Sequence, residues 1–296
     1  MIATGEPLPR VNRSMFAPRV IWVMWRRELV RYGRNRSQIF GGLSRTVLWL
    51  LILGFGLGAS LRQIEGYSYA QYILPGVVTL NVLFASLQSA IALVWDRQVG
   101  LLREVQVSPA PMLSVALGKL LGGATIAVAQ GSIPFLFIPI IGVPFSVTKL
   151  LLAWAVMFSM GVFLTAFGVV LASRMRTFEG FGSISNGVIQ PLYFLSGSIF
   201  PIRGIIGGVG FLDIPEELRN ELARLGVYAI GGGWVVQLPV WIRVLVFANP
   251  VSYQLDLLRF VLLDFRQLPM IVDLLVITIL PVIAALVAAM AMAKRS

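Results

Sequence analysis

The chain has 296 residues, of which 57% are hydrophobic and only 12% are charged, and its formal net charge is +11. With a mean hydropathy of +0.85, this composition excludes an ordinary soluble domain and predicts an all-α protein that crosses a membrane several times. The basic residues lie beside apolar runs, as anionic headgroups favour, so we expect membrane lipids and no nucleic acid among the partners. The sequence contains neither Cys nor His, which excludes disulfides and predicts no metal site and no catalytic residue.

The first segment with a helical pattern is basic and amphipathic. Within Met15–Arg36, Trp22 and Trp25 fall on an apolar face, whereas Arg26 and Arg27 fall on the opposite face. The segment is too polar to span a membrane, so we expect it to lie in the membrane surface with its tryptophans at headgroup depth. A basic helix that binds another protein is the alternative.

Apolar runs of membrane-spanning length fill most of the remaining chain. They are predicted at about 39–61, 72–95, 117–141, 150–173, 181–199 and 271–292. This pattern gives six transmembrane helices, separated by short polar connections. Arg45 lies near the start of the first helix, where its long side chain can reach back to the membrane surface. Pro134 and Pro139 interrupt the third, so we expect its far end to be kinked.

The connections between these helices differ in charge. Basic residues crowd the chain before the first span, the connection after the second, the connection after the fourth and the C-terminal tail, whereas the other connections hold few. Short basic loops stay on the cytoplasmic side of a membrane. The sequence therefore predicts a multi-pass protein of the plasma membrane with both termini in the cytoplasm.

The connection after the second span is a candidate docking site. Its charges must lie outside the hydrocarbon, and its first part can form a short helix that proline ends. A helix tied to a span on either side is suited to be gripped by a soluble cytosolic partner, although a solvated loop is the alternative. The residues predicted to dock that partner are Asp96, Arg97, Gly100, Leu101, Leu102, Arg103, Glu104 and Pro109.

The region before the last span is predicted to lie outside the cell. Asp213 is followed by Pro215 and by Glu216, a capping pattern that predicts a helix over 215–225. The stretches on either side of that helix are apolar, but Gly and Pro break them. We therefore expect them to form short helices that dip into the outer leaflet or cap the bundle.

Four segments together resemble the ABC-2 type permeases of ATP-binding-cassette exporters, in particular the daunorubicin-resistance-like and nodulation-factor exporters. They are DRQVGLLREVQVSP at 96–109, QPLYFLSGSIFP at 190–201, L-P-x-W-I from Leu238, and N-P-x-S-Y-x-x-D-x-x-R at 249–259. The resemblance implies an interfacial helix, six spans, a cytosolic coupling helix after the second span and re-entrant helices before the last. Related chains pass quickly from the F-P to the L-P-x-W, whereas this one inserts about 204–237.

The resemblance also implies partners and a transport route. The partners would be two copies of a cytosolic ATP-binding-cassette ATPase and a second permease copy, which makes a homodimer. The family places the route between two permease halves, with the fifth span contributing. The candidate lining residues are Asn186, Gln190, Tyr193, Phe194 and Ser196. Hydrogen bonding between helices is the alternative role for such side chains.

Two absences bear on the energy source. The sequence has no G-x-x-x-x-G-K-[ST] loop to hold the phosphates of ATP, so ATP and magnesium are expected in the partner and no cofactor in this chain. The middles of the predicted spans also lack charged residues, which a carrier driven by an ion gradient would need. An ion-driven transporter and a membrane-embedded enzyme remain the alternatives, the enzyme using the outer carboxylates Asp213, Glu216, Glu217, Asp256 and Asp264.

The predicted protein is thus a non-catalytic exporter permease for an amphipathic substrate, either drug-like or lipid-linked. Its expected parts are residues 1–38 as cytosolic tail and interfacial helix, 39–199 as the first five spans with the coupling helix at about 96–109, 200–270 as the external re-entrant segment with its inserted helix at about 215–225, and 271–296 as the last span and cytosolic tail.

Overall fold

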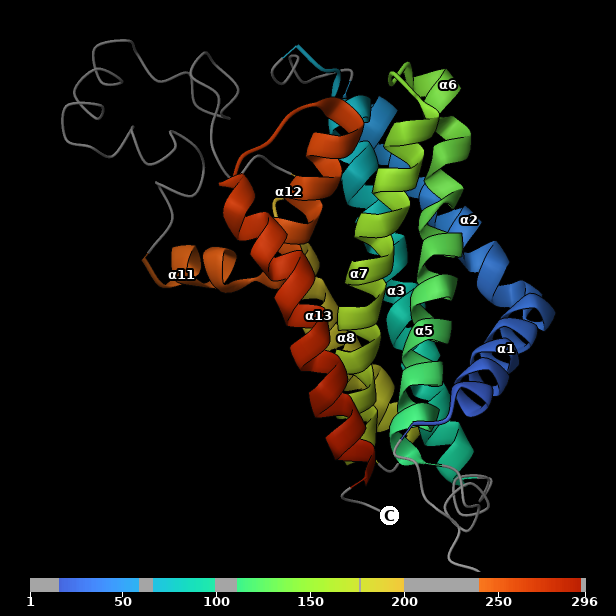
Figure 1. The fold of residues 1–296 in the computed structure, drawn as a ribbon. Helices are drawn as coiled ribbons and strands as arrows, with labels where there is room; N and C mark the ends of the chain where they lie inside the picture. Colours follow the sequence, from blue (N-terminus) through green and yellow to red (C-terminus); the bar gives the residue numbers. More distant parts are fainter. Residues whose placement is uncertain (1–15, 59–65, 99–110, 176, 200–239, 294–296) are drawn as a thin grey trace, which may run out of the picture.

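The computed structural model describes residues 16–58, 66–98, 111–175, 177–199 and 240–293. Every regular element in these ranges is a helix and none is a strand, which confirms the all-α prediction for this part of the chain. The long helices run alongside one another as an up-and-down bundle (Figure 1). We call the end that holds the last residues of α3 and α13 the inner end and the opposite end the outer end, following the predicted orientation.

The helix order begins with two helices joined at a sharp bend, α1 (Pro18–Arg34) and α2 (Arg36–Trp49), and α2 continues as a π-helical stretch, η1 (Leu50–Leu57). The bundle core follows with α3 (Tyr69–Gln98), α5 (Met112–Gly131), η2 (Ile133–Phe137), α6 (Ile138–Ile141), α7 (Val147–Arg174) and α8 (Phe178–Phe194). The chain ends with α11 (Val240–Ala248), α12 (Pro250–Leu263) and α13 (Met270–Ala293).

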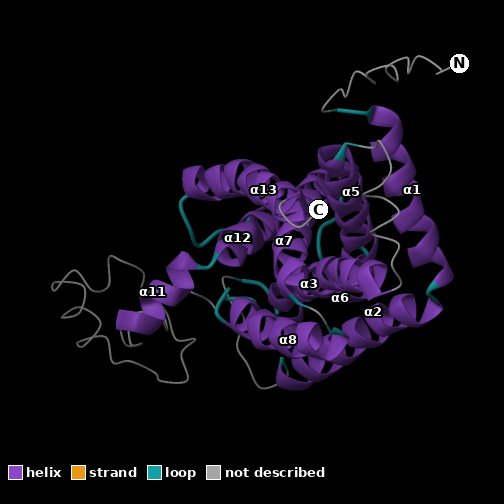
Figure 2. Ribbon diagram, turned by 90° about the horizontal axis from the view of Figure 1, so that it is seen from below, coloured by secondary structure: helices purple, strands orange, loops and turns teal. Residues whose placement is uncertain are grey.

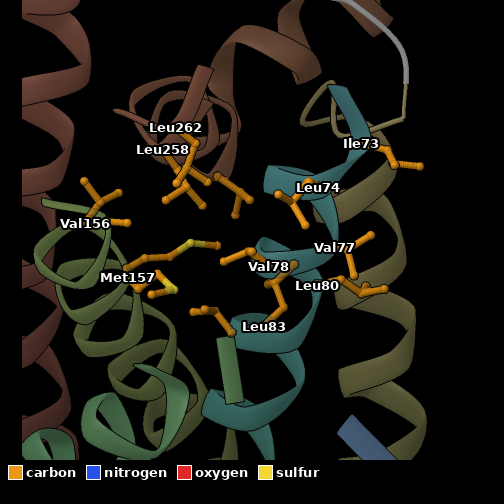
Figure 3. Close-up of a cluster of buried hydrophobic side chains, with 14 of the residues drawn as sticks. Ile73, Leu74, Val77, Val78, Leu80, Leu83, Val156, Met157, Leu258 and Leu262 are labelled. Atoms are coloured by element: carbon orange, nitrogen blue, oxygen red, sulfur yellow. The ribbon is translucent and has the colours of Figure 1, made fainter. Parts of the chain in front are cut away.

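Helix α3 lies at the centre of the bundle, where α5, α7 and α8 surround it (Figure 2). Its most apolar window is 83% buried, against 22% for the corresponding windows of α2 and α13. Val78 of α3 packs toward Met157 of α7, and Leu258 and Leu262 of α12 complete this part of the core (Figure 3). The apolar faces that α2 and α13 leave uncovered suit contact with lipid or with another protein chain.

Five helical stretches in the described residues are long and apolar enough to cross a membrane: Arg36–Gly56, Tyr69–Asp96, Met112–Ile141, Val147–Arg174 and Met270–Met292. The fifth predicted span corresponds to α8, which has 17 residues and is therefore about 25 Å long. That length falls short of the roughly 30 Å of a typical hydrocarbon core. Five of the predicted spans are thus confirmed as membrane-capable helices, and the crossing by α8 stays a prediction.

The proline break predicted in the third span is confirmed. The α-helix ends at Gly131, and Pro134 and Pro139 each stand at the start of a short following helix, the 3₁₀ helix η2 and the single turn α6. Proline lacks the N–H that continues an α-helical ladder and its ring clashes with the preceding turn. The span is therefore regular in its inner part and irregular toward the outer end.

Within the described residues, two short helices precede the last span. Helix α12 packs against α13, α7 and α3, whereas α11 points away from the bundle in both views (Figures 1 and 2). Asn249 begins α12 by accepting a hydrogen bond from the Val251 N–H, with Pro250 in the first turn. The predicted inserted helix at 215–225 lies outside the described residues, and the re-entrant placement of α11 and α12 stays a prediction.

Candidate functional site

The inner end of the bundle contains a group of paired charges, three of them buried, which we call the inner charge cluster (Arg27, Glu28, Arg31, Asp96 and Lys119). The Asp96 carboxylate accepts hydrogen bonds from the Lys119 ammonium and the Arg27 guanidinium, each over 2.8 Å. The Lys119 nitrogen also lies 3.5 Å from the Glu28 carboxylate, which in turn pairs with Arg31. Glu28, Lys119 and Asp96 are 1%, 4% and 6% exposed, so these ions are held largely away from water.

The cluster joins three helices at the base of the predicted docking segment. Arg27 and Glu28 belong to α1, Asp96 lies near the end of α3, and Lys119 lies early in α5. Because an uncompensated buried charge is costly, the buried Glu28, Asp96 and Lys119 depend on their partners. The ion pairs therefore hold α1, the end of α3 and the start of α5 together.

Helix α1 packs on α5 through two glycines. A Cβ atom added to Gly118 would lie 2.6 Å from the Met24 Cβ, and one added to Gly122 would lie 2.7 Å from the Glu28 Cβ. Both distances are too short for real side chains. The Gly118-x-x-x-Gly122 spacing thus lets the backbones of α1 and α5 approach closely along one face.

Hydrogen bonds also hold α1 on α5 along the face that contains Gly118 and Gly122. The Ala17 N–H donates to the Ser114 hydroxyl over 2.8 Å, and the Trp25 indole N–H donates to the Thr125 hydroxyl over 3.1 Å. Burial raises the pKa of the Tyr32 phenol, as expected for a ring set against the bundle. The amphipathic helix is confirmed, and its placement in the membrane surface stays a prediction.

The predicted surface residues of this helix divide between two roles. Trp22 is 57% exposed and Arg26 is exposed, as a lipid-facing or partner-facing position requires. Trp25 and Arg27 instead contact α5 and α3 through their polar atoms. The basic face therefore contributes to the bundle as well as to its surroundings.

Of the predicted docking residues, the structure describes the backbone of Asp96 and Arg97 at the end of α3. Asp96 is buried and its carboxylate is bonded inside the chain, so it anchors the segment. Gly100, Leu101, Leu102, Arg103, Glu104 and Pro109 lie outside the described residues, and their docking role stays a prediction. Sequence reasoning missed the pairing of Glu28 with Lys119, although a single acid among arginines and a single lysine in an apolar run were available signals.

The motif residues near the outer end form a second group, the outer polar cluster (Tyr72, Gly197, Asp256, Arg259 and Gln267). Arg259 is 1% exposed; it donates to the Gly197 carbonyl over 2.9 Å, and its guanidinium carbon lies 4.2 Å from the centre of the Tyr72 ring. The Asp256 carboxylate accepts the backbone N–H of Gln267 over 2.8 Å and that of Leu268 over 2.9 Å.

Contacts of this kind join the two sequence motifs of the outer end, the segment at 190–197 and the segment at 249–259. The Asn249 amide donates to the Leu192 carbonyl over 2.7 Å, so both ends of the N-P-x-S-Y-x-x-D-x-x-R motif meet the Q-P-L-Y-F-L-S-G segment. A Cβ atom on Gly76 of α3 would lie 2.7 Å from the Ser198 carbonyl oxygen. The turn after α8 is therefore held between α3 and α12.

The structure separates the predicted lining residues into two sets. Asn186, Gln190 and Phe194 are exposed and follow one another at intervals of four along α8. Tyr193 and Ser196 are fully buried; the Ser196 hydroxyl donates to the Tyr193 carbonyl over 2.7 Å. The exposed set can contact a solute, whereas the buried pair supports the turn.

An uncharged polar stripe runs along the exposed side of α8. It consists of Ser183, Asn186 and Gln190, which are all exposed, and we call it the polar face of α8. Polar side chains facing lipid are unfavourable and usually mark a water-lined path or a contact between helices. The polar face of α8 is thus better suited to contact with water, a solute or another helix than to contact with lipid tails.

Arg45 corrects one prediction made from the sequence. Its Nε atom donates to the Asn81 side-chain oxygen over 2.9 Å, and its guanidinium carbon lies 4.1 Å from the centre of the Phe84 ring. Asn81 and Phe84 lie in the middle part of α3 (Tyr69–Gln98). The side chain is therefore held at mid-depth and does not reach back to the surface. The Arg45 charge therefore does lie against the middle of a predicted span, where Asn81 gives it a polar partner.

A helical bundle with several membrane-capable helices, a charged inner end and a polar stripe on one helix defines a multi-pass membrane protein with the features of a transport component. Residues 19–212 match the family model described as ABC-2 type transporter, and the chain belongs to that family. Permeases of this family are membrane components of ABC transporters, generally not catalytic themselves, and normally pair with a cytosolic ATP-binding-cassette ATPase.

Named relatives agree with this assignment. The chain is 22% identical over 256 residues to transport permease ycf38 of Cyanophora paradoxa, covering 83% of this chain and 75% of that protein. It is 24% identical over 188 residues to Nodulation protein J of Rhizobium leguminosarum bv. trifolii, covering 61% and 70%. It is 26% identical over 196 residues to Nodulation protein J of Rhizobium meliloti (strain 1021), covering 63% and 72%.

Proposed function

We propose that this chain is the transmembrane permease of an ATP-driven exporter in the plasma membrane. It would act as a homodimer with two copies of a cytosolic ATPase and move an amphipathic or lipid-linked substrate outward. ATP and magnesium would bind the ATPase, since this sequence has no loop to hold nucleotide phosphates. The observation that carries the proposal is the inner charge cluster, which ties three helices together at the base of residues 99–110.

Energy coupling would use that connection. An ATPase that grips the docking segment would move the end of α3 and the start of α5, which flank it. The shared ion pairs would oblige α1 to follow, because separating them leaves buried charges without partners. Closing and opening of the ATPase pair would in this way reach the spans of each copy.

The transport route would lie between two copies of the chain. Six spans, with α8 as the fifth, would give each copy half of an enclosed path, and the polar face of α8 supports placing that helix on the path. Asn186 and Gln190 are exposed there, and Phe194 beside them is 41% exposed. A surface that combines amides with an aromatic ring suits an amphipathic substrate.

The docking step can be tested by reversing Arg103 and Glu104 together and measuring co-purification of the ATPase with the permease. We expect ATPase association to fall while the permease remains folded. Arg174→Glu is the matched control, because Arg174 is exposed at the same end of the bundle and outside the docking segment. Full ATPase occupancy with normal transport in the double reversal would show that the segment does not dock the ATPase.

Orientation can be tested with single cysteines, since the native chain has none. Ser68 at the outer end and Arg174 at the inner end are both exposed. On intact cells, a membrane-impermeant thiol reagent should label Ser68→Cys and spare Arg174→Cys. The reverse pattern would overturn the proposed topology. Transport driven by an ion gradient without ATP would instead support the secondary-transporter alternative.

A further inference from the structure

We propose that Arg45 is an anion-recognition residue, and that the transported amphiphile carries an acidic group such as a phosphate or carboxylate. That the bound amphiphile is transported rests on the proposed function. The anion site itself rests on the geometry around Arg45. The substrate class is thus an acidic amphiphile, and Arg45 is the residue that distinguishes an acidic amphiphile from a neutral one.

The depth of Arg45 is the first observation. Its partner Asn81 lies 12 residues from Tyr69 and 15 from Asp96, the ends of a membrane-capable helix. At a rise of about 1.5 Å per residue, these separations are roughly 18 Å and 22 Å. Asn81 is fully buried and donates in turn to the Thr46 hydroxyl over 2.7 Å. The guanidinium is thus held against the middle of a membrane-capable helix by a polar contact with Asn81.

The unused donors of Arg45 are the second observation. Arginine remains protonated in proteins and offers five N–H donors. Among the described residues, the Nε–H of Arg45 has a hydrogen-bond acceptor. The two terminal nitrogens of Arg45 have neither an acceptor nor a carboxylate partner there. Arg45 is partly exposed. A fork of free donors therefore remains available at a depth where water is scarce.

The direction of the side chain is the third observation. Trp49, one turn further along α2, packs edge-on against Tyr193 of α8 at 5.4 Å between ring centres. Phe84 of α3 lies beneath the guanidinium, and Gln88, one turn away on α3, is exposed. Helices α2, α3 and α8 lie side by side along one side of the bundle (Figure 2), and Arg45 contacts α3 one turn before the contact of α2 with α8.

Among the described residues, no acidic side chain forms an ion pair with Arg45. Glu28, Asp96, Asp256 and Asp273 are buried, while Glu179 and Asp264 stand at helix ends, in the first turn of α8 and after α12. The neighbouring side chains on the face are uncharged amides and rings. A bidentate acidic group is the partner that fits a guanidinium fork in a dry setting.

Binding can be measured on the full chain purified in neutral detergent, without the ATPase. The probes are lysophosphatidic acid and the monoacylglycerol of the same acyl chain, which lacks the phosphate. We expect the acidic probe to bind at least about tenfold more tightly than the neutral one. Arg45→Gln should remove that difference, and Arg45→Lys should retain part of it. Arg36→Gln, on the same helix but exposed near its start, should leave it unchanged.

A second variant keeps the test decisive if Arg45→Gln does not fold. Asn81→Asp places a carboxylate at the position of the acceptor that now lies 2.9 Å from Nε. It should neutralise the guanidinium internally and abolish the preference for the acidic probe while leaving Arg45 in place. Equal binding of both probes by the native chain, or an unchanged preference in Asn81→Asp, would overturn the proposal.

A further measurement separates cargo from resident lipid. In vesicles that contain the permease with its ATPase, the acidic probe should stimulate ATP hydrolysis, and Arg45→Gln should abolish the stimulation. Binding that depends on Arg45 without stimulation would assign the site to a resident acidic lipid and refute the cargo assignment. Failure of any ATPase to associate would refute the exporter function while leaving the binding result, and hence the anion site, intact.

Discussion

The two ends of the bundle hold buried charges in different ways. In the inner charge cluster, side chains bind side chains, and several have more than one partner: Asp96 accepts from Lys119 and Arg27, and Lys119 also approaches Glu28. In the outer polar cluster, the shorter hydrogen bonds of the charged side chains go to backbone groups, since Arg259 donates to the Gly197 carbonyl over 2.9 Å and Asp256 accepts the Gln267 N–H over 2.8 Å, whereas Arg259 reaches the Gln267 side chain only over 3.4 Å.

This difference indicates what each end tolerates. Asp96 of α3 is held by Arg27 of α1 and Lys119 of α5 at once, so the three helices can move together without leaving a buried charge unpaired. The Arg259 guanidinium, which donates to the Gly197 carbonyl and over a longer 3.4 Å to the Gln267 side-chain oxygen, loses its shorter contact when the turn at Gly197 moves. We infer that the inner end suits transmission of movement and the outer end suits maintenance of shape.

The largest effect is expected from breaking the inner cluster at its centre. Lys119→Met leaves the Asp96 and Glu28 carboxylates buried with fewer partners, and we expect the free energy of unfolding to fall by about 3–5 kcal/mol. Denaturant titration in detergent measures it. Lys149→Met is the control, because Lys149 pairs with Asp264, whose side chain is 68% exposed; that loss should stay below about 1 kcal/mol. Equal losses would contradict the burial argument.

A double replacement sharpens the same comparison. Lys119→Met with Asp96→Leu removes both ions, and buried ion pairs replaced by apolar groups are often neutral for stability. We expect this variant to regain much of the stability lost in Lys119→Met. ATP hydrolysis in the assembled transporter should nevertheless become uncoupled from transport, because the link between α1 and α3 is gone. Normal coupling would show that the pairs only stabilise the fold.

The outer cluster should be sensitive to the shape of its cation. Arg259→Lys keeps the charge but cannot both reach the Gly197 carbonyl and lie flat over Tyr72 as the guanidinium does. We expect a loss of about 1.5–3 kcal/mol in the free energy of unfolding. Arg174→Lys, at an exposed position, serves as the reference and should change little. A native-like value for Arg259→Lys would mean that charge alone matters there.

A smaller effect is expected where α1 packs on α5. Gly118→Ala brings a methyl group against Met24 and the Ile21 backbone, and overpacking of this kind costs about 1–3 kcal/mol. Limited proteolysis within α1 should become faster. Gly33→Ala, whose added atom meets nothing within 4 Å, should leave the proteolysis rate unchanged or lower it.

The smallest effect on stability is expected on the polar face of α8. Asn186→Leu and Gln190→Leu change exposed side chains, so the free energy of unfolding should shift by no more than about 0.5 kcal/mol. Transport rate should change clearly if the face lines the route. An unchanged rate in both variants would remove α8 from the proposed route.

Much of the fold followed from local signals in the sequence. Apolar runs located the long helices, and Pro134 marked the break in the third span. These features depend on residues close together in the chain, which is why rules of pattern and of helix termination reach them.

Features that depend on distant contacts were beyond those rules. The pairing of Lys119 with Glu28 joins helices that are far apart in sequence, and periodicity does not say which helices meet. Arg45 was placed near the membrane surface because snorkelling is the usual behaviour of such a residue. Its true position depends on Asn81, 36 residues away. The division of the α8 residues into exposed and buried sets likewise required the neighbours of that helix.

The contact of α1 with α5 has a consequence for how the chain is made. The hydrogen bond from Trp25 to Thr125 spans 100 residues, so the partner surface for α1 does not exist until the third span has been synthesised. Until then, α1 must wait at the membrane with its Glu28 carboxylate lacking Lys119. Because chains emerge from the N-terminus onward, α1 is expected to reach its final place later than its early position in the chain suggests.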